Sequence, residues 1–465
     1  MAAVAARFVL LEAWVCLALG TEEFHVFRGV MAAPPTDMND SVGRRHGVDD
    51  PFALRWKELM MRTRWTSVWG LLATAAILVA NPVLARQQEP TTREQAIEEA
   101  QEEKSQHLTP FVASPAEQQV ARALRMVQGT SLKWHPFFEN AYAGGGFTLG
   151  LGYRFAVSPF NTIDVRGSYT VSDYKRIEAQ FDAPRLFKRR GELFVLGGWR
   201  EATQVGFYGI GTGNTSIDNR ANYSFQQPYL ETSLTVKPTR RYWVVNGTAE
   251  YSQWKQRSGE GNEPSVETVY SPANLAGLGA TVEYLHTQGT MGFDWRTARG
   301  YSRRGGYYAI TAHDYFDHDD RYGFRQVDYE AIQHVPILRE AWVLSFRALA
   351  QTTFDKDGQD IPFFMLPSVG GGSTLRGFTS WRFRDRNSLL LQAEWRIMVN
   401  RFLDTAVFYD TGKVAARARD LDLDGLKNNV GFGVRFHGPL ATPLRVEVAR
   451  GNEGVSLVFS SSAVF

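Results

Sequence analysis

A long glycine-rich segment and two carboxylates beyond it form the most distinctive polar group in the sequence. The segment, about residues 354–386, carries Arg376, and Glu394 and Asp410 lie on the two strands predicted after it. A guanidinium presents a fork of donors that matches carboxylates, and a buried ion without a partner is costly. The chemistry predicted here is therefore an ion-pair network that holds the segment in place, with Arg376 paired to Glu394 and Asp410.

The strands that would position these carboxylates are visible as strict alternation of apolar and polar residues. In 389–399 the apolar residues alternate with Gln392, Glu394 and Arg396, and Asp410 shares a face with Asp404 and Phe408. A period of two places such residues on opposite faces of a β-strand. If the apolar face contacts lipid, Glu394 and Asp410 both point into the lumen of a barrel.

This alternation runs from about Tyr142 to the C-terminus and predicts an all-β fold, a 16-stranded antiparallel transmembrane β-barrel with a short helical N-terminal periplasmic lead. The even number is typical of single-chain bacterial barrels. Counting back from the C-terminus places the long 256–274 connection at the end where turns are short, which leaves the register of the first eight strands open. The strands are expected near 142–155, 160–172, 174–187, 191–206, 225–237, 241–255, 275–286, 288–297, 305–317, 322–334, 340–353, 387–399, 402–413, 429–437, 443–450 and 455–465.

A soluble sandwich would show the same alternation, and the N-terminal region favours the membrane barrel instead. From Met61, two arginines precede an apolar stretch, and small residues end at Ala85, which is typical of a secretory signal peptide. The apolar stretch is shorter than the roughly 20 residues that a spanning helix needs. We therefore expect 1–60 to be a mis-called upstream extension and 61–85 to be the signal peptide. Residues 86–135 are then a periplasmic helical or linker segment, and 136–465 are the outer-membrane β-barrel.

Within the periplasmic segment one short helix is expected. Ser114 as N-cap, Pro115 at the first helical position and Glu117 form a capping box, and Gly129 supplies a C-terminal stop. Its apolar stripe is too narrow to form a core alone. The helix could dock on the barrel or remain a solvated linker.

Composition excludes several other classes of function. The 51 basic and 49 acidic residues give a net charge of +2, which does not favour a nucleic-acid partner. The single cysteine, Cys16, leaves no disulfide or cysteine-based metal site within one chain. We expect no cofactor, no metal and no catalytic residue, because no Ser-His-Asp or nucleophile-elbow spacing is present.

Three further groups of residues have simpler readings than a ligand site. The stretch 313–321, with His313 and His318 among aspartates, is read as an exposed loop rather than a metal site. Residues 420–431 have calcium-loop spacing at first, but Gly431 stands where the final Glu should be. The glycines at 144–152 lack the context of a nucleotide loop and are read as a weak first strand.

The segment and the strands after it resemble a known family. Leu375, Arg376, Gly377 and Phe378 match the (V/I)RG(F/Y) motif on the long sixth extracellular loop of the BamA/TamA superfamily, the bacterial surface antigen family, with Leu replacing Val or Ile. The resemblance covers about 290–465 well and 137–290 by pattern only. In that family the motif arginine contacts acidic residues on the two following strands, whose places Glu394 and Asp410 occupy. The closing Phe465 resembles the C-terminal strand signal by which such barrels are recognised for assembly.

The resemblance also implies a function. It indicates a non-enzymatic protein, integral to the bacterial outer membrane and in contact with its lipids, that inserts outer-membrane proteins or translocates polypeptide. Its partners would be nascent outer-membrane or secreted polypeptides, and a seam between the first and last strands would open sideways. No periplasmic POTRA domain fits residues 86–135, so we expect a POTRA-less member. The alternative is a structural or solute-conducting outer-membrane pore without assembly activity.

Overall fold

The structure is a computed structural model, and it describes the barrel region almost completely. The described residues are 97–103, 118–119, 133–213, 216–239, 242–338, 340–438, 441–461, 463 and 465. Residues 97–103 are helical and exposed. The proposed upstream extension, the signal peptide and most of the helix expected between Ser114 and Gly129 lie outside the described residues and stay predictions.

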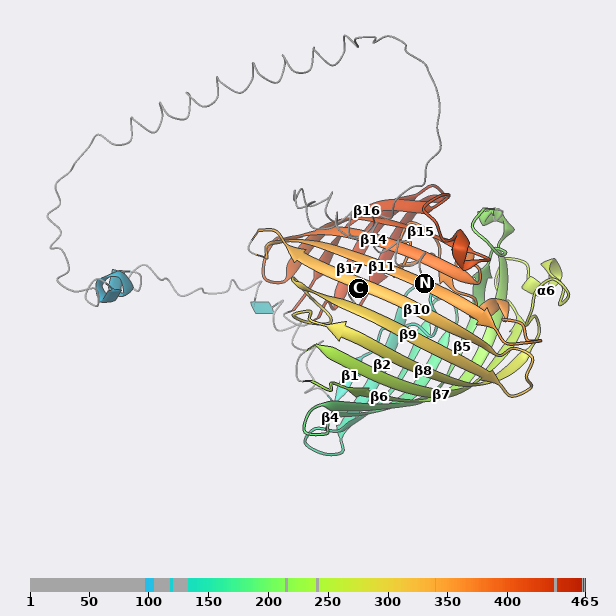
Figure 1. Cartoon of the computed structure of the whole chain (residues 1–465), viewed down its shortest axis with the longest axis horizontal. Coiled ribbons are helices and arrows are strands. Elements are labelled where there is room, and N and C mark those ends of the chain that lie inside the picture. Colours follow the sequence, from blue (N-terminus) through green and yellow to red (C-terminus); the bar gives the residue numbers. More distant parts are fainter. Residues whose placement is uncertain are drawn as a thin grey trace, which may run out of the picture. The chain divides into compact units, whose positions relative to one another are not determined.

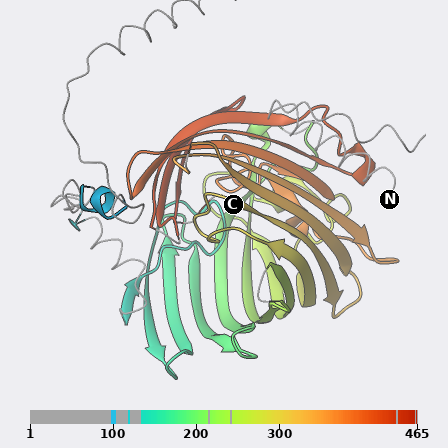
Figure 2. The ribbon, with the colours of Figure 1, turned by 60° about the vertical axis from the view of Figure 1, so that its left-hand side comes forward.

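Sixteen strands form one antiparallel sheet that curls into a barrel wall, as predicted (Figures 1 and 2). Along the sheet they are β1 (Trp134–Pro136), β2 (Thr148–Ala156), β3 (Thr162–Thr170), β4 (Lys175–Leu186), β5 (Gly191–Phe207), β6 (Ala221–Val236), β7 (Trp243–Ser258), β8 (Thr281–Asp294), β9 (Gly305–Asp317), β10 (Phe324–Pro336), β11 (Trp342–Asp355), β14 (Asn387–Met398), β15 (Leu403–Ala415), β16 (Lys427–Phe436), β17 (Leu444–Gly451) and β18 (Gly454–Ser460). In the described part of the chain no ladder joins β1 to β18, so these two strands are the edges of the sheet.

The connections contain the remaining elements. A two-stranded sheet of β12 (Ser368–Val369) and β13 (Phe383–Arg384) lies between β11 and β14, next to the 3-10 helix η2 (Phe363–Met365). The other short helices are η1 (Ile217–Asn219), α6 (Val266–Val269) and η3 (Ala418–Asp420). None of the helices in the described residues has the length and apolar character needed to cross a bilayer.

Burial in the wall is inverted relative to a soluble protein. On β15, Val407 and Tyr409 are 50% and 47% exposed, whereas Phe408 and Asp410 between and beside them are 2% and 0% exposed. On β16, Phe432 is 63% exposed and Arg435 only 3%. Apolar side chains outside and polar side chains inside are the arrangement that lipid around the wall stabilises.

The number of strands agrees with the sequence prediction, but two of the predicted strands were wrong. Residues 275–286 and 288–297 were expected as separate strands, whereas β8 runs without a break from Thr281 to Asp294. The predicted break falls at residue 287, yet ladders to β7 and β9 run through this position on both sides. The sequence prediction did not include β1, which supplies the sixteenth strand and whose three residues include Pro136. Proline is tolerated in an edge strand because its missing N–H costs no ladder bond there.

This correction also resolves the register of the first eight strands. Because neighbouring strands are antiparallel, connections alternate between the two ends of the barrel. The long connections 137–147, 208–220, 259–280, 356–386 and 416–426 share one end, here called the long-loop end, where α6 lies (Figure 1). The other end, the short-turn end, has only turns of four to ten residues. The connection after β7 therefore lies with the long loops, and its predicted placement among short turns was wrong.

The glycine-rich strand is the second strand, not the first as predicted. A Cβ on Gly152 would lie 2.4 Å from the ring of His135 on β1. That ring reaches over β2 to Asp164 on β3, with 2.8 Å between His135 Nε2 and Asp164 Oδ1. Glycine is thus required here for a close approach, and the edge strand is bonded to β3 as well as to β2.

Candidate functional site

The segment between β11 and β14 is anchored to the inner face of the wall. Its apolar side chains pack against wall residues that face inward, and the cluster comprises Val369, Leu375, Phe378, Phe383, Leu390 and Val414. Leu390 on β14 and Val414 on β15 are 1% and 2% exposed. This packing brings the predicted motif, residues 375–378, against the strands that follow it.

Gly377 sets how closely the segment approaches the wall. A Cβ at this position would lie 2.5 Å from Cβ of Asn429 on β16 and 2.8 Å from the backbone nitrogen of Gly451 on β17. Real Cβ contacts do not come this close. Glycine therefore allows the backbone of the segment to lie directly on the wall, with the neighbouring Arg376 side chain aimed along it.

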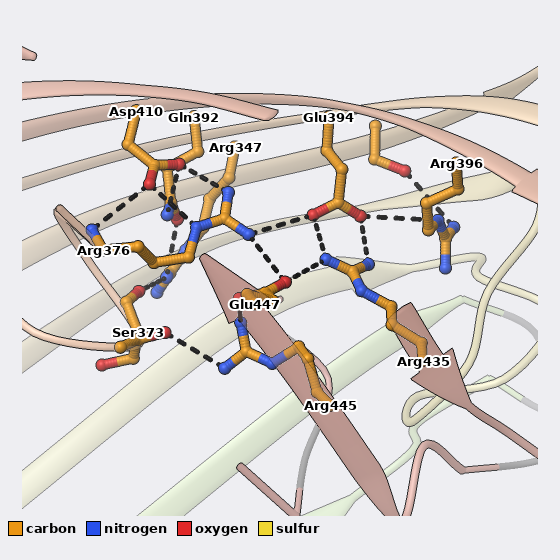
Figure 3. A network of polar contacts seen from close by, with 12 residues as sticks. Arg347, Ser373, Arg376, Gln392, Glu394, Arg396, Asp410, Arg435, Arg445 and Glu447 are labelled. Atoms are coloured by element: carbon orange, nitrogen blue, oxygen red, sulfur yellow. Dashed lines mark hydrogen bonds and ion pairs between the residues drawn. The ribbon is translucent and has the colours of Figure 1, made fainter. Parts of the chain in front are cut away.

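Arg376 is fully buried and uses its donors on three carboxylates (Figure 3). Its Nε and Nη2 donate to the two oxygens of Asp410 at 2.8 and 2.6 Å. Its Nη1 lies 3.3 Å from Glu394 and 3.1 Å from Glu447. The guanidinium carbon also lies 3.4 Å from the centroid of the Phe408 ring. Arg376 is thus brought together with both carboxylates named from the sequence, and with a third that was not.

That third carboxylate, Glu447 on β17, belongs to a wider network that sequence reasoning missed. Arg435 on β16 bridges Glu394 and Glu447, with two short bonds to Glu394 and one of 2.8 Å to Glu447. Arg445 donates to Glu447 at 2.7 Å. The signal that could have found them was present, because Arg445 and Glu447 alternate with apolar Leu444, Val446 and Val448.

Wall side chains also hold the backbone of the segment just before Arg376. Arg347 donates to the carbonyl of Ser373 at 3.2 Å, and Gln392 donates to the carbonyl of Thr374 at 2.8 Å. From the other side, Arg445 donates to the carbonyl of Gly372 at 3.0 Å. Three consecutive carbonyls are therefore hydrogen-bonded to side chains of β11, β14 and β17. These bonds hold the backbone that leads into Arg376.

The electrostatics of Arg376 follow from these partners. Burial disfavours the charged form, but the hydrogen bonds with Asp410 and the charges of Asp410, Glu394 and Glu447 outweigh it and raise the pKa of the guanidinium. The arginine is charged at any physiological pH. Every group in this network donates or accepts within an ion pair, an arrangement suited to holding a segment in place rather than to covalent chemistry.

A second buried polar group lies at the short-turn end. Residues 295–304, which join β8 to β9, reach the strands that carry the first network: the hydroxyl of Tyr301 donates to Asp404 on β15 at 2.6 Å. The Tyr301 ring stacks on His437 with 4.0 Å between centroids, and Gly300 forms a parallel bridge with Ala441. Arg396 of β14 donates to the carbonyl of Ser302. This connection is therefore fastened to residues about a hundred or more positions away.

The remaining residues named from the sequence lie elsewhere. The last strand ends at Ser460, not at 465 as predicted, and the ring of Phe465 lies 6.1 Å from that of His334 on β10. His313 and Asp314 belong to strand β9 rather than to a loop. Among the described residues no group of three or more His, Cys, Asp or Glu side chains could hold a metal ion. The role of Phe465 as an assembly signal stays a prediction.

Comparison with solved structures supports the fold. The chain is similar to the crystal structure of BamA from Haemophilus ducreyi lacking POTRA domains 1–3, at 13% identity and a TM-score of 0.50, over 75% of this chain and 78% of that one. It is also similar to CdiB from Escherichia coli (14% identity, TM-score 0.47, 70% and 59% of the two chains) and to CdiB from Acinetobacter baumannii (11%, 0.44, 68% and 57%). No curated protein matches the sequence.

The sequence itself matches a family over most of the barrel. The profile described as the Omp85 superfamily domain matches residues 160–454, which span β3 to the start of β18 and include the whole Arg376 network. The inverted burial, the sixteen antiparallel strands and the segment anchored to the inner wall agree with that match. The chain therefore belongs to the Omp85 superfamily and is an outer-membrane β-barrel protein.

Proposed function

We propose that this protein acts, without enzymatic chemistry, in the insertion of polypeptides into the bacterial outer membrane or their translocation across it. Membership of the Omp85 superfamily and the BamA-like fold support the general role. Its substrates would be nascent outer-membrane or secreted polypeptides, which meet the barrel from within or beside the wall.

The observation that carries the proposal is the anchoring of the 356–386 segment by Arg376. The network joins that segment to β14, β15, β16 and β17, the strands next to the C-terminal edge of the sheet. The segment is thereby tied to four neighbouring strands of the wall. The edge strands β1 and β18 lie outside this network, and a seam can open between them.

An open seam offers a physical route for a substrate strand. Edge strands present unpaired backbone N–H and C=O groups, and an extended polypeptide can add to them as a further strand. Such pairing requires no reactive side chain. Strand addition requires only that the edge be free while the rest of the wall stays intact. The Arg376 network stabilises the wall next to the C-terminal edge.

The decisive test is depletion of the protein in its own host, followed by quantitative proteomics of the outer membrane. Loss of a defined set of outer-membrane or secreted proteins is the expected result. A second arm joins the edges through cysteines placed along 133–138 and 454–460, with Cys16 replaced. The crosslinked form should lose activity and regain it on reduction.

One outcome would overturn the proposal, and a second would exclude the seam as its route. An unchanged proteome together with steady conductance of the purified protein in planar bilayers would identify a solute pore instead. Full activity with crosslinked edges would exclude the seam while leaving a translocation route through the lumen.

A further inference from the structure

The short-turn end carries basic and aromatic side chains that take no part in the Arg376 network. Three turns lie side by side there, 157–161, 187–190 and 237–242, because β3 pairs with β4 and β5 pairs with β6. Among the described residues, the basic ones on or next to these turns are Arg185, Lys188, Arg189, Arg190 and Lys237. The aromatic residues are Phe160, Phe187, Tyr242 and Trp243, each between 44% and 62% exposed. We call these residues the basic turn patch.

Specific contacts make the patch one continuous surface. The backbone N–H of Lys237 donates to the carbonyl of Arg190 at 2.7 Å, which joins the second and third turns. The guanidinium carbon of Arg185 lies 3.7 Å from the centroid of the Phe160 ring, which joins the first and second. The charged groups therefore have a fixed spacing and do not belong to independent loops.

The turn at the centre of the patch has an unusual backbone. Phe187, Lys188 and Arg189 have φ values of 47°, 57° and 68°, in the left-handed region that residues with a Cβ adopt at a cost. The N–H of Arg190 closes the turn by donating to the carbonyl of Leu186 at 3.0 Å. Glycine would adopt this turn most easily. Large exposed side chains stand there instead, which points to a contact that uses them.

The charge of the patch is largely uncompensated. Lys237 is paired with Glu192 at 2.7 Å, but Lys188, Arg189 and Arg190 make no ion pair within the described part of the chain. Basic residues also outnumber acidic ones in the other turns at this end of the barrel, although Asp294 at the end of β8 pairs with Arg296 and Arg299. Across its turns, the described residues include nine Lys or Arg and one acidic residue, Glu340. A strong positive field therefore faces whatever lies at the short turns.

The aromatic side chains indicate where this field acts. Trp243 begins β7, and two residues further on Val245 belongs to the apolar outer face, 42% exposed. Aromatic residues at the ends of barrel strands mark the boundary between hydrocarbon and headgroups. The basic groups of the patch thus stand at headgroup depth, where a lipid phosphate can reach them. An acidic polypeptide in water would gain nothing from the exposed rings at this boundary.

We propose that the basic turn patch binds the phosphate headgroups of anionic glycerophospholipids, of the phosphatidylglycerol type, in the leaflet that the short turns face. Guanidinium groups bind phosphate oxygens through paired hydrogen bonds, and the neighbouring rings contact the glycerol and upper acyl region. Each basic group near an anionic lipid surface contributes about fivefold to binding, an effect that falls as salt rises. The bound lipids fix the depth of the short turns in the membrane.

The test uses the full chain purified in a non-ionic detergent with equal amounts of phosphatidylglycerol and phosphatidylcholine, and counts bound lipids by native mass spectrometry. The wild type should retain phosphatidylglycerol preferentially. The triple variant Lys188→Gln, Arg189→Gln, Arg190→Gln should weaken this preference at least tenfold. A matched control, Arg257→Gln, Arg417→Gln, Arg419→Gln, removes the same charge near the long-loop end and should leave it unchanged.

A charge-preserving variant guards against misfolding as an explanation. Lys188→Arg, Arg189→Lys, Arg190→Lys keeps the charge and should keep the preference, and all variants should retain the compact barrel on unheated gels. The proposal is overturned if the glutamine variant still prefers phosphatidylglycerol or if the control loses the preference equally. It is also overturned if the patch selects lipid A over phosphatidylglycerol, or binds poly-glutamate while showing no preference among lipids.

Discussion

The guanidinium of Arg376 forms a bidentate ion pair with the carboxylate of Asp410. The distances are 2.8 Å from Nε to Oδ2 and 2.6 Å from Nη2 to Oδ1, and the pair joins the middle of the 356–386 segment to strand β15. Both side chains are fully buried. The point charge of a lysine cannot reproduce this geometry, and a fully buried ion left without its partner is costly. The position of the 356–386 segment therefore depends on this one ion pair.

Replacing Arg376 by Lys or Ala should therefore loosen the barrel. Arg376→Ala leaves three carboxylates short of a cation, at a cost of about 3–5 kcal/mol in the free energy of unfolding. Arg376→Lys keeps the charge but loses the paired hydrogen bonds to Asp410, so its destabilisation should be smaller. The measurement is the temperature at which the compact form disappears on gels of unboiled samples. Arg386→Lys, in the exposed pair with Asp355, is the control and should leave that temperature unchanged. An unaltered transition in Arg376→Ala would refute the bracing role.

Glu447 should matter as much as the two carboxylates named from the sequence. It accepts from Arg376, Arg435 and Arg445, so Glu447→Gln leaves three buried arginines sharing fewer negative charges. We expect about 3 kcal/mol of destabilisation in denaturant unfolding. The half-exposed Glu340→Gln serves as control, and a double-mutant cycle with Arg376→Lys should show strong coupling. Additive effects would mean that the pair does not interact.

Gly377→Ala tests whether the segment lies directly on the wall. The new Cβ would have to move Asn429 or the backbone at Gly451, at a cost of about 1–3 kcal/mol. The compact form should be lost at a lower temperature than in the wild type. Gly247→Ala is the comparison, because nothing lies within 4 Å of its added Cβ. Equal behaviour of the two variants would contradict the close approach.

Tyr301→Phe should release the connection between β8 and β9. The variant loses the 2.6 Å bond to Asp404, worth about 1–3 kcal/mol for a buried acceptor. Residues 295–304 contain four arginines, so trypsin reports their release directly. Faster cleavage there is expected, with Tyr409→Phe on the outer face as control. A disulfide between Gly300→Cys and Ala441→Cys should suppress this cleavage. If neither change alters the rate of trypsin cleavage, residues 295–304 are not held by these contacts.

Individual strands show which parts of the fold follow from the sequence and which do not. Alternation in 389–399 gave the face of Glu394 correctly, because a period of two is a property of the local backbone. The same local logic failed at β8, which it divided into two strands at residue 287. It also missed β1, because three residues with a proline carry no periodic signal. Those strands exist because neighbouring ladders hold them, and pairing partners are not local information.

The sequence by itself determined the fold class, the faces of the C-terminal strands and the residues of the motif at 375–378, since each depends on local periodicity or on a short string of residues. Tertiary structure alone decided that Glu447, Arg435 and Arg445 complete the Arg376 network, that Phe465 lies near His334, and that three separate turns form one basic surface. The physical reason is that the sheet curls, so that strands distant in the sequence face one interior. This arrangement brings together charges that are far apart in the chain, and a buried charge selects whichever partner the packed wall places within reach.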